Sequence, residues 1–436
     1  MKTNKIDEFK RILKEHWLEG LVLLLGVGLR LVLAGITVHP DLLSISAGDF
    51  LLFKKGVVNI YEYLAQAPAS ERVIEVYGRS FFTYPPLAYF TLGFFNFLLS
   101  PLFSGELYTR FLGGVRAFSG LGFDTDLLIL KVPYLIFDLL LAALLFKIFE
   151  KDRKKAWLAF YLWFFNPLSL YTSFMVGQFD IIPTFLVVLS VFWTIRERRE
   201  LAALSLGIGA SLKMFPLFFL PILILVLGKS FWQKLKLTAI GILPYLVSIA
   251  PFMKTSAFRQ TVLFSGQSQK MLFMTLPVSG AEGVYLFIFG LVLIYLYTAY
   301  KQSLMLRNKG QQEKIWQYYF WVLLLFFSVT HYYPQWFLWL TPFLIWTMIE
   351  SNWRRFWPSL ILVGCWLVIT LLFEPSLSVG LFAPILPQLK NVSLGNFGTL
   401  SRGAGFRFAG GNLDAFQIRS LTRSIFAATS FWLAIF

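Results

Sequence analysis

Residues 18–38 read LEGLVLLLGVGLRLVLAGITV, and this apolar run is followed directly by the polar segment 39–41 (HPD). About twenty apolar residues are enough for a helix to cross a bilayer, so we predict a first membrane span here. A largely polar stretch then continues as far as residues 83–87 (TYPPL). Because most of the remaining chain is apolar, we interpret this stretch as a water-facing active-site loop.

The composition excludes an ordinary soluble protein. Of the 436 residues, 57% are hydrophobic and 14% are charged, and the mean hydropathy is +0.67. Such values are typical of a chain whose core lies largely in lipid. The single cysteine, Cys365, excludes a disulfide framework and a cysteine-based metal site. We attribute the formal net charge of +16 to basic cytoplasmic loops and predict no nucleic-acid binding.

Apolar runs of spanning length predict about twelve crossings, and therefore an all-α, polytopic transmembrane helical bundle. The runs are about 18–38, 127–148, 155–175, 181–195, 201–213, 214–228, 236–252, 282–300, 315–330, 332–349, 356–374 and 421–436. If the N-terminus is cytoplasmic, every loop on the inner side is short and basic, as the positive-inside rule requires. These loops contain Lys147, Lys151, Arg153, Lys154 and Lys155; Arg196, Arg198 and Arg199; Lys229, Lys234 and Lys236; Lys301, Arg307, Lys309 and Lys314; and Arg354 and Arg355.

Two segments decide this topology. If the apolar segment 84–104 crossed the bilayer, the lysine cluster after the second span would lie outside. We therefore predict a juxtamembrane or re-entrant helix there, within a long external loop, 39–126. The run 201–228 is too long for one helix and contains Lys213 and Pro216, so we predict a helical hairpin or a broken pair.

Unusual polar side chains gather at the external ends of the predicted spans or just beyond them. They are Asp41, Asp49, Tyr84, Gln178, Asp180, Lys213 and the segment 331–336 (HYYPQW). Burying an ionisable group at membrane depth costs roughly 2.5–3.5 kcal/mol on insertion scales, so such groups persist mainly where a cavity or a partner stabilises them. A substrate cavity that opens to the exterior explains the clustering.

Purely structural interpretations compete with this one. Asp41 and Asp180 could cap the helices that follow them, and Lys213 could extend its ammonium to the membrane interface. Lys131 and Asp138 lie seven residues apart on one helical face, which predicts a structural intramembrane ion pair. An aromatic belt at the interface is the favoured interpretation of Tyr333, Trp336 and Trp339.

Several motifs occur in a characteristic order along the chain. They are a carboxylate just after the first span, a long loop ending in 84–87 (YPPL), Lys131 to Asp138 in the next span, 163–167 (WFFNP), 177–180 (GQFD) and 211–216 (SLKMFP). Over about residues 15–350 this set resembles the GT-C superfamily of integral membrane glycosyltransferases. It most resembles the members that use polyprenyl-phosphate mannose or glucose.

The resemblance implies a reaction. Such enzymes pass one sugar from a polyprenyl-phosphate carrier to an acceptor hydroxyl on the non-cytoplasmic side, with inversion at the anomeric carbon. Asp41 occupies the position of the general base that removes the acceptor proton, and Asp49 is the reserve candidate. The two are not adjacent, so the short paired acidic motif of some relatives is absent and the choice stays open. The phosphate leaving group needs a cation, which Lys213 or, as alternatives, Arg259 or His331 would supply.

The remaining expectations follow from the same resemblance. The substrate-binding set comprises Tyr84, Gln178, Asp180, Lys213, Arg259, His331, Tyr332 and Gln335. We expect no cofactor and no obligatory divalent metal. The partners would be a polyprenyl-phosphate-linked sugar, with mannose favoured, a lipid or glycan acceptor and the lipids of a bacterial or archaeal plasma membrane.

The domain division and one competing function stay open. Residues 1–374 would form the catalytic domain, and 375–436 a Gly-rich external loop (395–411) with a final span. The chain ends within its last apolar run, which leaves open that the natural protein is longer. A lipid-linked glycan flippase or a polysaccharide transporter is the alternative function, but such proteins are expected to show internal repeats, and we find none.

Overall fold

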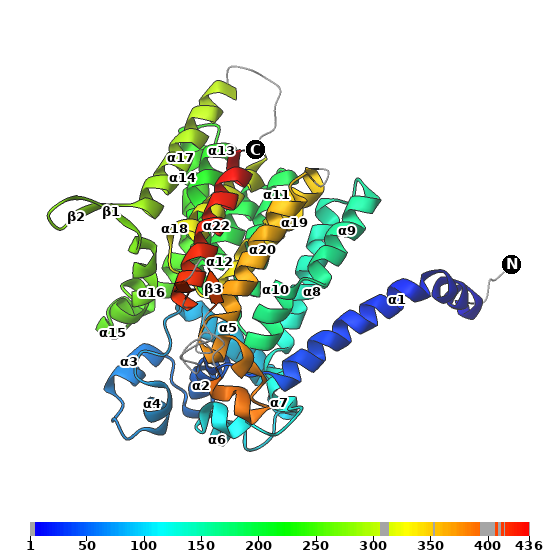
Figure 1. The fold of residues 1–436 in the computed structure, drawn as a ribbon, viewed down its shortest axis with the longest axis vertical. Coiled ribbons are helices and arrows are strands. Elements are labelled where there is room, and N and C mark those ends of the chain that lie inside the picture. The colour runs from blue at the N-terminus through cyan, green and yellow to red at the C-terminus, as the bar shows by residue number, and fades with distance from the viewer. Residues whose placement is uncertain are drawn as a thin grey trace.

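Helices dominate the structure. The computed structural model describes residues 5–305, 314–351, 354–392, 406–408, 411–413 and 415–435. In this part of the chain the strands form two short hairpins and the rest is helical or irregular, so the prediction of an all-α fold is confirmed. Figure 1 shows a helical bundle with a group of short helices at one end, and α1 (Lys5–Ile36) extending away from the bundle.

The segment predicted as a long loop, 39–126, forms this group of short helices (Figure 1). Its elements are α2 (Pro40–Lys55), α3 (Ile60–Gln66), α4 (Arg72–Tyr77), α5 (Pro86–Leu98), the 3₁₀ helices η1 (Ser100–Leu102) and η2 (Gly114–Phe118), α6 (Leu107–Phe111) and α7 (Thr125–Leu130). Prolines begin α2 and α5, because proline fits the first helical turn, where no amide hydrogen bond is lost. The 13 residues of α5 span about 20 Å, which is less than the ~30 Å hydrocarbon core.

The bundle begins with α8 and continues to α14. Its elements are α8 (Val132–Ile148), α9 (Arg153–Phe164), α10 (Pro167–Ser169), the π-helix η3 (Leu170–Val176), α11 (Ile181–Ile195), α12 (Arg199–Leu212), η4 (Phe215–Phe218), α13 (Leu220–Leu227), α14 (Phe231–Ile249) and η5 (Ala250–Phe252). The predicted break in the run 201–228 occurs at Lys213, whose extended backbone (φ −156°, ψ 131°) ends α12. Helices α12 and α14 approach closely, since a Cβ on Gly207 would lie 2.4 Å from the carbonyl oxygen of Gly241.

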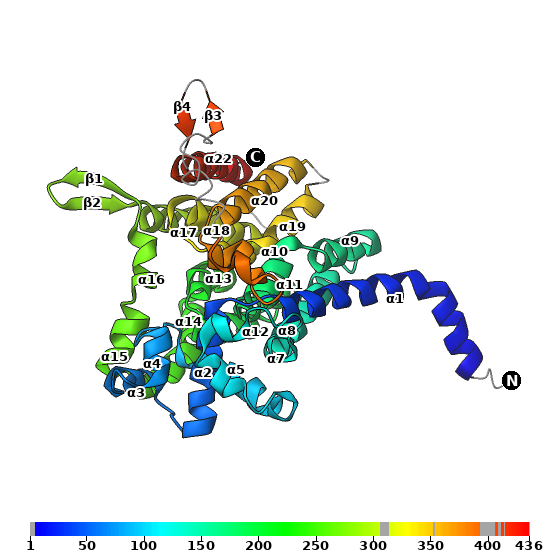
Figure 2. The same cartoon turned by 60° about the horizontal axis from the view of Figure 1, so that its bottom comes forward.

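The second half of the chain completes the bundle. Its elements are α15 (Ser256–Phe258), the π-helix η6 (Arg259–Leu263), α16 (Gly266–Gln269), η7 (Lys270–Leu272), β1 (Thr275–Ser279), β2 (Glu282–Tyr285), α17 (Leu286–Met305), α18 (Ile315–Val329), η8 (Pro334–Trp339), α19 (Thr341–Glu350), α20 (Phe356–Leu371), η9 (Pro375–Leu377), η10 (Val379–Phe382), η11 (Pro387–Asn391), β3 (Phe406–Phe408), β4 (Gly411–Leu413) and α22 (Ala415–Ile435). Strands β1 and β2 pair antiparallel with Thr275 opposite Tyr285, and β3 pairs antiparallel with β4. Figure 2 shows both hairpins projecting from the helices. Most of the predicted Gly-rich loop, 395–405, lies outside the described residues.

Length and composition identify few of these helices as complete membrane spans. Among the described residues, Phe231–Phe252 and Leu286–Leu304 are long and apolar enough, and the pair Gly20–Ile36 and Pro40–Lys55, bent by 81°, is a third candidate if it counts as one span. Other apolar helices are shorter, such as Ile181–Ile195, which at 1.5 Å per residue spans about 22 Å. The prediction of about twelve crossings is therefore not confirmed and stays a prediction.

The predicted ion pair between Lys131 and Asp138 is wrong. Lys131 Nζ instead donates hydrogen bonds to the carbonyl oxygens of Ala34 and Thr37, at 2.9 and 2.7 Å, and to that of Phe174. It lies where α7 passes into α8, and its hydrogen bonds join this point to the end of α1 and to η3.

Asp138 has a different cationic partner, on α1. Its Oδ2 accepts a hydrogen bond from Arg30 Nε at 2.8 Å, and both side chains are fully buried. Ser169 and the indole of Trp163 donate to the other carboxylate oxygen. Helical spacing within one segment could not reveal these partners, because α1, α9 and the residues just after α9 lie in other parts of the sequence.

Candidate active site

A cavity of about 120 Å³ lies where the short helices meet the bundle. The first turn of α2, the residues just before α5, the break after α12 and the 3₁₀ helix η8 all contribute to its wall. Four residues of the predicted site line it, namely Asp41, Tyr84, Lys213 and Gln335. Residues from four separate parts of the sequence therefore meet in one place.

Asp41 presents its carboxylate to this cavity. Gln178 Nε2 donates a hydrogen bond to Asp41 Oδ2 at 2.7 Å, which fixes the orientation of the carboxylate. The Asp41 backbone amide donates to Nδ1 of the buried His39, which caps α2. The Asp41 side chain remains 42% exposed, so it is held in place yet accessible to a substrate. His39 was not predicted as a site residue.

Asp49 lies elsewhere. It is 1% exposed in the middle of α2, and it does not line the cavity. Its Oδ2 accepts a hydrogen bond from Asn96 Nδ2, on α5, at 3.1 Å. This contact joins the two helices of the short-helix group, so Asp49 has a structural position and Asp41 is the better placed candidate base.

Lys213 forms a buried ion pair across the cavity wall. Its Nζ lies 2.7 Å from Asp180 Oδ1, and the side chains are 10% and 0% exposed. The indole Nε1 of Trp339 donates to the same oxygen at 2.5 Å. The simple expectation of a snorkelling lysine does not describe this arrangement, because the ammonium is paired inside the protein. Since Lys213 also lines the cavity, a ligand can contact the same cation.

Aromatic rings surround the Lys213 ammonium. The ring centroids of Tyr84, Trp336 and Trp339 each lie 5.3 Å from Nζ, and that of Phe179 lies 5.7 Å away. Such distances permit cation–π attraction. Trp336 and Trp339 are 9% and 4% exposed, so the favoured interpretation of these two residues as an interfacial belt is wrong. They form the wall of the cavity.

A tight turn positions the two residues behind the cavity. Gly177 ends η3 in the left-handed region (φ 75°), where a Cβ would meet Leu42 and Lys131 at 3.0 Å. The turn places Gln178 against Asp41 and, two residues later, Asp180 against Lys213. One short segment therefore orients both the carboxylate and the ammonium that face the cavity.

Five residues predicted to bind substrate do not line the cavity: Gln178 and Asp180, which lie behind it, and Arg259, His331 and Tyr332. The guanidinium of Arg259 donates to the carbonyl oxygens of Met253 and Lys254, and thus stabilises its own loop. Tyr332 is fully buried, and the Arg423 guanidinium lies 4.6 Å from the centre of its ring. Burial and, to a lesser extent, nearby cations lower the pKa of His331 to about 4, so this imidazole is neutral at pH 7.

Lys270 is a cation near the site that the sequence did not identify. Its Nζ lies 3.5 Å above the ring of Tyr333 and 5.5 Å from the ring of Trp336, both in the cavity wall. Burial lowers its pKa to about 8, an effect that the Asp41 carboxylate partly opposes. The polar segment around Lys270 carries no recognisable motif, and its position depends on packing of η7 against distant residues.

The described residues contain no group of three or more His, Cys, Asp or Glu side chains arranged to hold a metal ion. The expectation that no metal is required therefore stays a prediction.

Comparison with known proteins identifies the family. No curated protein matches the chain. The model of glycosyltransferase family 87, a family of GT-C-type membrane glycosyltransferases, matches residues 82–328, which is more than half of the chain. The matched region contains Tyr84, Gln178, Asp180, Lys213 and Lys270. The chain therefore belongs to glycosyltransferase family 87 and is a membrane glycosyltransferase.

Proposed function

We propose that this glycosyltransferase moves a single hexose, most simply mannose, from a polyprenyl-phosphate carrier to a hydroxyl of a lipid or glycan acceptor. The observation that carries the proposal is the presence of the Asp41 carboxylate and the Lys213 ammonium in the wall of one cavity. A carboxylate and a cation are the two groups that a direct displacement of a sugar from phosphate requires.

Asp41 acts as the general base. An acceptor hydroxyl becomes a competent nucleophile when a carboxylate within hydrogen-bond reach takes its proton. Gln178 holds one oxygen of Asp41 at 2.7 Å while the side chain stays 42% exposed. The hydroxyl oxygen attacks the anomeric carbon as the bond to the phosphate oxygen breaks. One displacement of this kind inverts the anomeric configuration.

Lys213 and Lys270 stabilise the phosphate that leaves. Because Asp180 already neutralises much of the charge of Lys213, a second cation would strengthen the field at the leaving oxygen. Lys270 is suited to this role, since its ammonium lies against two rings that flank the cavity. We assign the phosphate to these two lysines in preference to His331, which is neutral, and Arg259, which is engaged by its own loop.

The orientation in the membrane follows from charge. The short-helix group, which contributes residues to the cavity wall, lies at one end of the bundle, while the end of α19, close in sequence to the basic residues Arg354 and Arg355, lies at the other (Figure 1). Basic loops favour the cytoplasmic side, so we place the cavity on the non-cytoplasmic face and the N-terminus in the cytoplasm. No divalent metal is required in this scheme, because the leaving charge is met by ammonium groups.

The test is transfer of a labelled sugar. Purified protein in detergent is incubated with polyprenyl-phosphate [³H]mannose or [³H]glucose and a membrane lipid extract, and products are analysed for a new glycosidic bond. Formation of a labelled glycolipid or glycan with inverted configuration supports the proposal. Intact lipid-linked sugar that crosses the bilayer of proteoliposomes without bond formation would support a flippase instead.

A further inference from the structure

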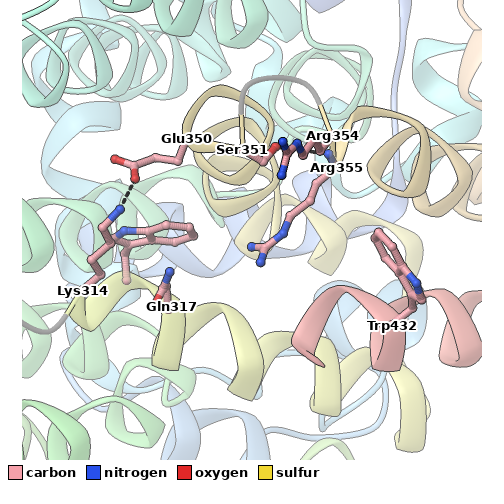
Figure 3. Close-up of a pocket in the computed structure, with 8 residues that line it drawn as sticks. Lys314, Gln317, Glu350, Ser351, Arg354, Arg355 and Trp432 are labelled. Atoms are coloured by element: carbon pink, nitrogen blue, oxygen red, sulfur yellow. Dashed lines mark hydrogen bonds and ion pairs between the residues drawn. The ribbon is translucent and has the colours of Figure 1, made fainter. Parts of the chain in front are cut away.

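A second cavity lies at the end of the bundle opposite the active site. Its volume is about 670 Å³, and it is formed by the start of α18, the end of α19, the start of α20 and the end of α22. Figure 3 shows Arg355 reaching into the space between the Lys314–Glu350 ion pair and Trp432. The active-site scheme makes no use of this cavity.

Its wall carries an excess of positive charge. Of the eight lining residues, Lys314, Arg354 and Arg355 are cations, and Glu350 is the one carboxylate. Glu350 is already paired with Lys314. Arg355 is half-buried, its Nη1 lies 3.5 Å from the Thr347 hydroxyl, and burial lowers the pKa of its guanidinium. The guanidinium groups of Arg354 and Arg355 lie beside a lysine whose charge is balanced by Glu350. Such a surface suits an anion with several oxygens, above all phosphate.

Two of the helices that form this cavity, α18 and α22, also line an apolar groove. It has a volume of about 710 Å³ and runs between α17, α18 and α22. On α22, Trp432 lines the cavity and the adjacent Phe431 lines the groove. On α18, Gln317 lines the cavity and Trp321 the groove, four residues and therefore about 6 Å further along the helix axis. A polar cavity and an apolar groove are therefore lined by the same two helices, α18 and α22.

We propose that the cavity and the groove together bind an anionic phospholipid, with its phosphate beside Arg354 and Arg355 and one acyl chain between α17, α18 and α22. Charge complementarity selects the headgroup, because zwitterionic lipids carry a cation that the arginines repel. The exposed indole of Trp432 lies at the junction, where the amphipathic tryptophan side chain is suited to the headgroup level of a bilayer. Binding at this end leaves the active-site cavity open to its own substrates.

The test measures lipid binding in the full-length protein in detergent. Binding is monitored by thermal unfolding and by native mass spectrometry. The protein is titrated separately with phosphatidylglycerol, phosphatidylcholine, neutral diacylglycerol and inorganic phosphate. We expect saturable stabilisation and a retained adduct with phosphatidylglycerol. We expect the apparent affinity to fall roughly tenfold in Arg354→Gln and in Arg355→Gln, as loss of a charge-assisted hydrogen bond implies. The matched control is Lys154→Gln, an exposed basic residue outside the cavity, which should bind like wild type.

Further variants separate the polar and apolar parts. Arg355→Lys retains the charge and should bind more tightly than Arg355→Gln, which keeps the test valid if the latter unfolds. Ala434→Trp fills the groove. It should weaken the binding of phosphatidylglycerol without changing the response to inorganic phosphate. Equal binding by wild type and both glutamine variants would overturn the proposal. Inorganic phosphate that reproduced the full effect of the lipid would overturn the assignment to a phospholipid and leave a simple anion site.

Discussion

Replacement of Lys213 by methionine separates the structural role of the buried ion pair from its role in transfer. The change keeps much of the side-chain volume but leaves the Asp180 carboxylate, which is 0% exposed, without its cation. Removal of one partner of a buried pair typically costs about 3–5 kcal/mol, because the remaining charge stays desolvated. Trp339 still donates to Asp180, so we expect a loss near the lower end, about 3 kcal/mol.

A double variant isolates the catalytic contribution. Lys213→Met/Asp180→Asn removes both charges while the asparagine oxygen can still accept from Trp339, so stability should recover largely. Transfer should remain about 10²-fold below wild type, because the cation that stabilises the leaving phosphate is still missing. The assays are chemical denaturation in detergent and initial transfer rate against polyprenyl-phosphate-sugar concentration.

The control uses an exposed ion pair on the same protein. Lys236 and Glu200 are 62% and 53% exposed, and surface pairs contribute about 0–1 kcal/mol, so Lys236→Met should change neither stability nor transfer appreciably. Recovery of wild-type transfer in the Lys213→Met/Asp180→Asn variant would refute the phosphate role of Lys213. A stable Lys213→Met single variant would refute the energetic importance of the pair.

Three further predictions use other parts of the site and of the topology. Because burial lowers the pKa of Lys270 to about 8, its charge is present at pH 7 and is lost as the pH rises through about 8. The KM for the donor should therefore rise over this range in wild type and stay constant in Lys270→Arg. Gln178→Leu removes the hydrogen bond that orients the carboxylate, so kcat should fall by roughly tenfold with the KM for the donor unchanged, and an unaltered kcat would contradict this positioning role. In a Cys365→Ala background, a cysteine at Arg72 should react with an impermeant thiol reagent in intact cells and one at Lys151 should not; labelling of Lys151 would reverse the proposed orientation.

Local sequence pattern predicted the features that depend on short stretches of chain. Apolar runs gave the all-α class, Pro216 and Lys213 gave the break after α12, and the apolar segment 84–104 gave the helix within the first loop. These outcomes depend on backbone geometry and hydropathy within a few residues. The ordered motifs predicted the glycosyltransferase class, which the family match confirms.

Long-range pairing of charges could not be predicted in this way. Helical spacing suggested that Lys131 pairs with Asp138, yet each has a partner on α1, about one hundred residues away in the sequence. For the same reason, local sequence pattern did not reveal the contact of Lys213 with Asp180 or the position of Lys270 against Tyr333. In each case the partner depends on how helices pack, and hydropathy does not encode that packing residue by residue.

The most direct test of the central claim compares Asp41→Asn with Asp49→Asn. Asparagine keeps the volume of either side chain but removes most of the proton-accepting power of the carboxylate. Because Asp41 lines the cavity and Asp49 is buried against Asn96, the two variants form a matched pair within one helix. The measurement is the initial rate of sugar transfer from labelled polyprenyl-phosphate mannose, at equal amounts of folded protein.

Transfer by Asp41→Asn should fall by roughly 10²–10⁴-fold, as expected for loss of a general base, while the KM for the donor changes little. Asp49→Asn should retain most of the wild-type rate per folded molecule. Near-normal transfer in Asp41→Asn together with abolished transfer in Asp49→Asn would contradict the account and move the base out of the cavity.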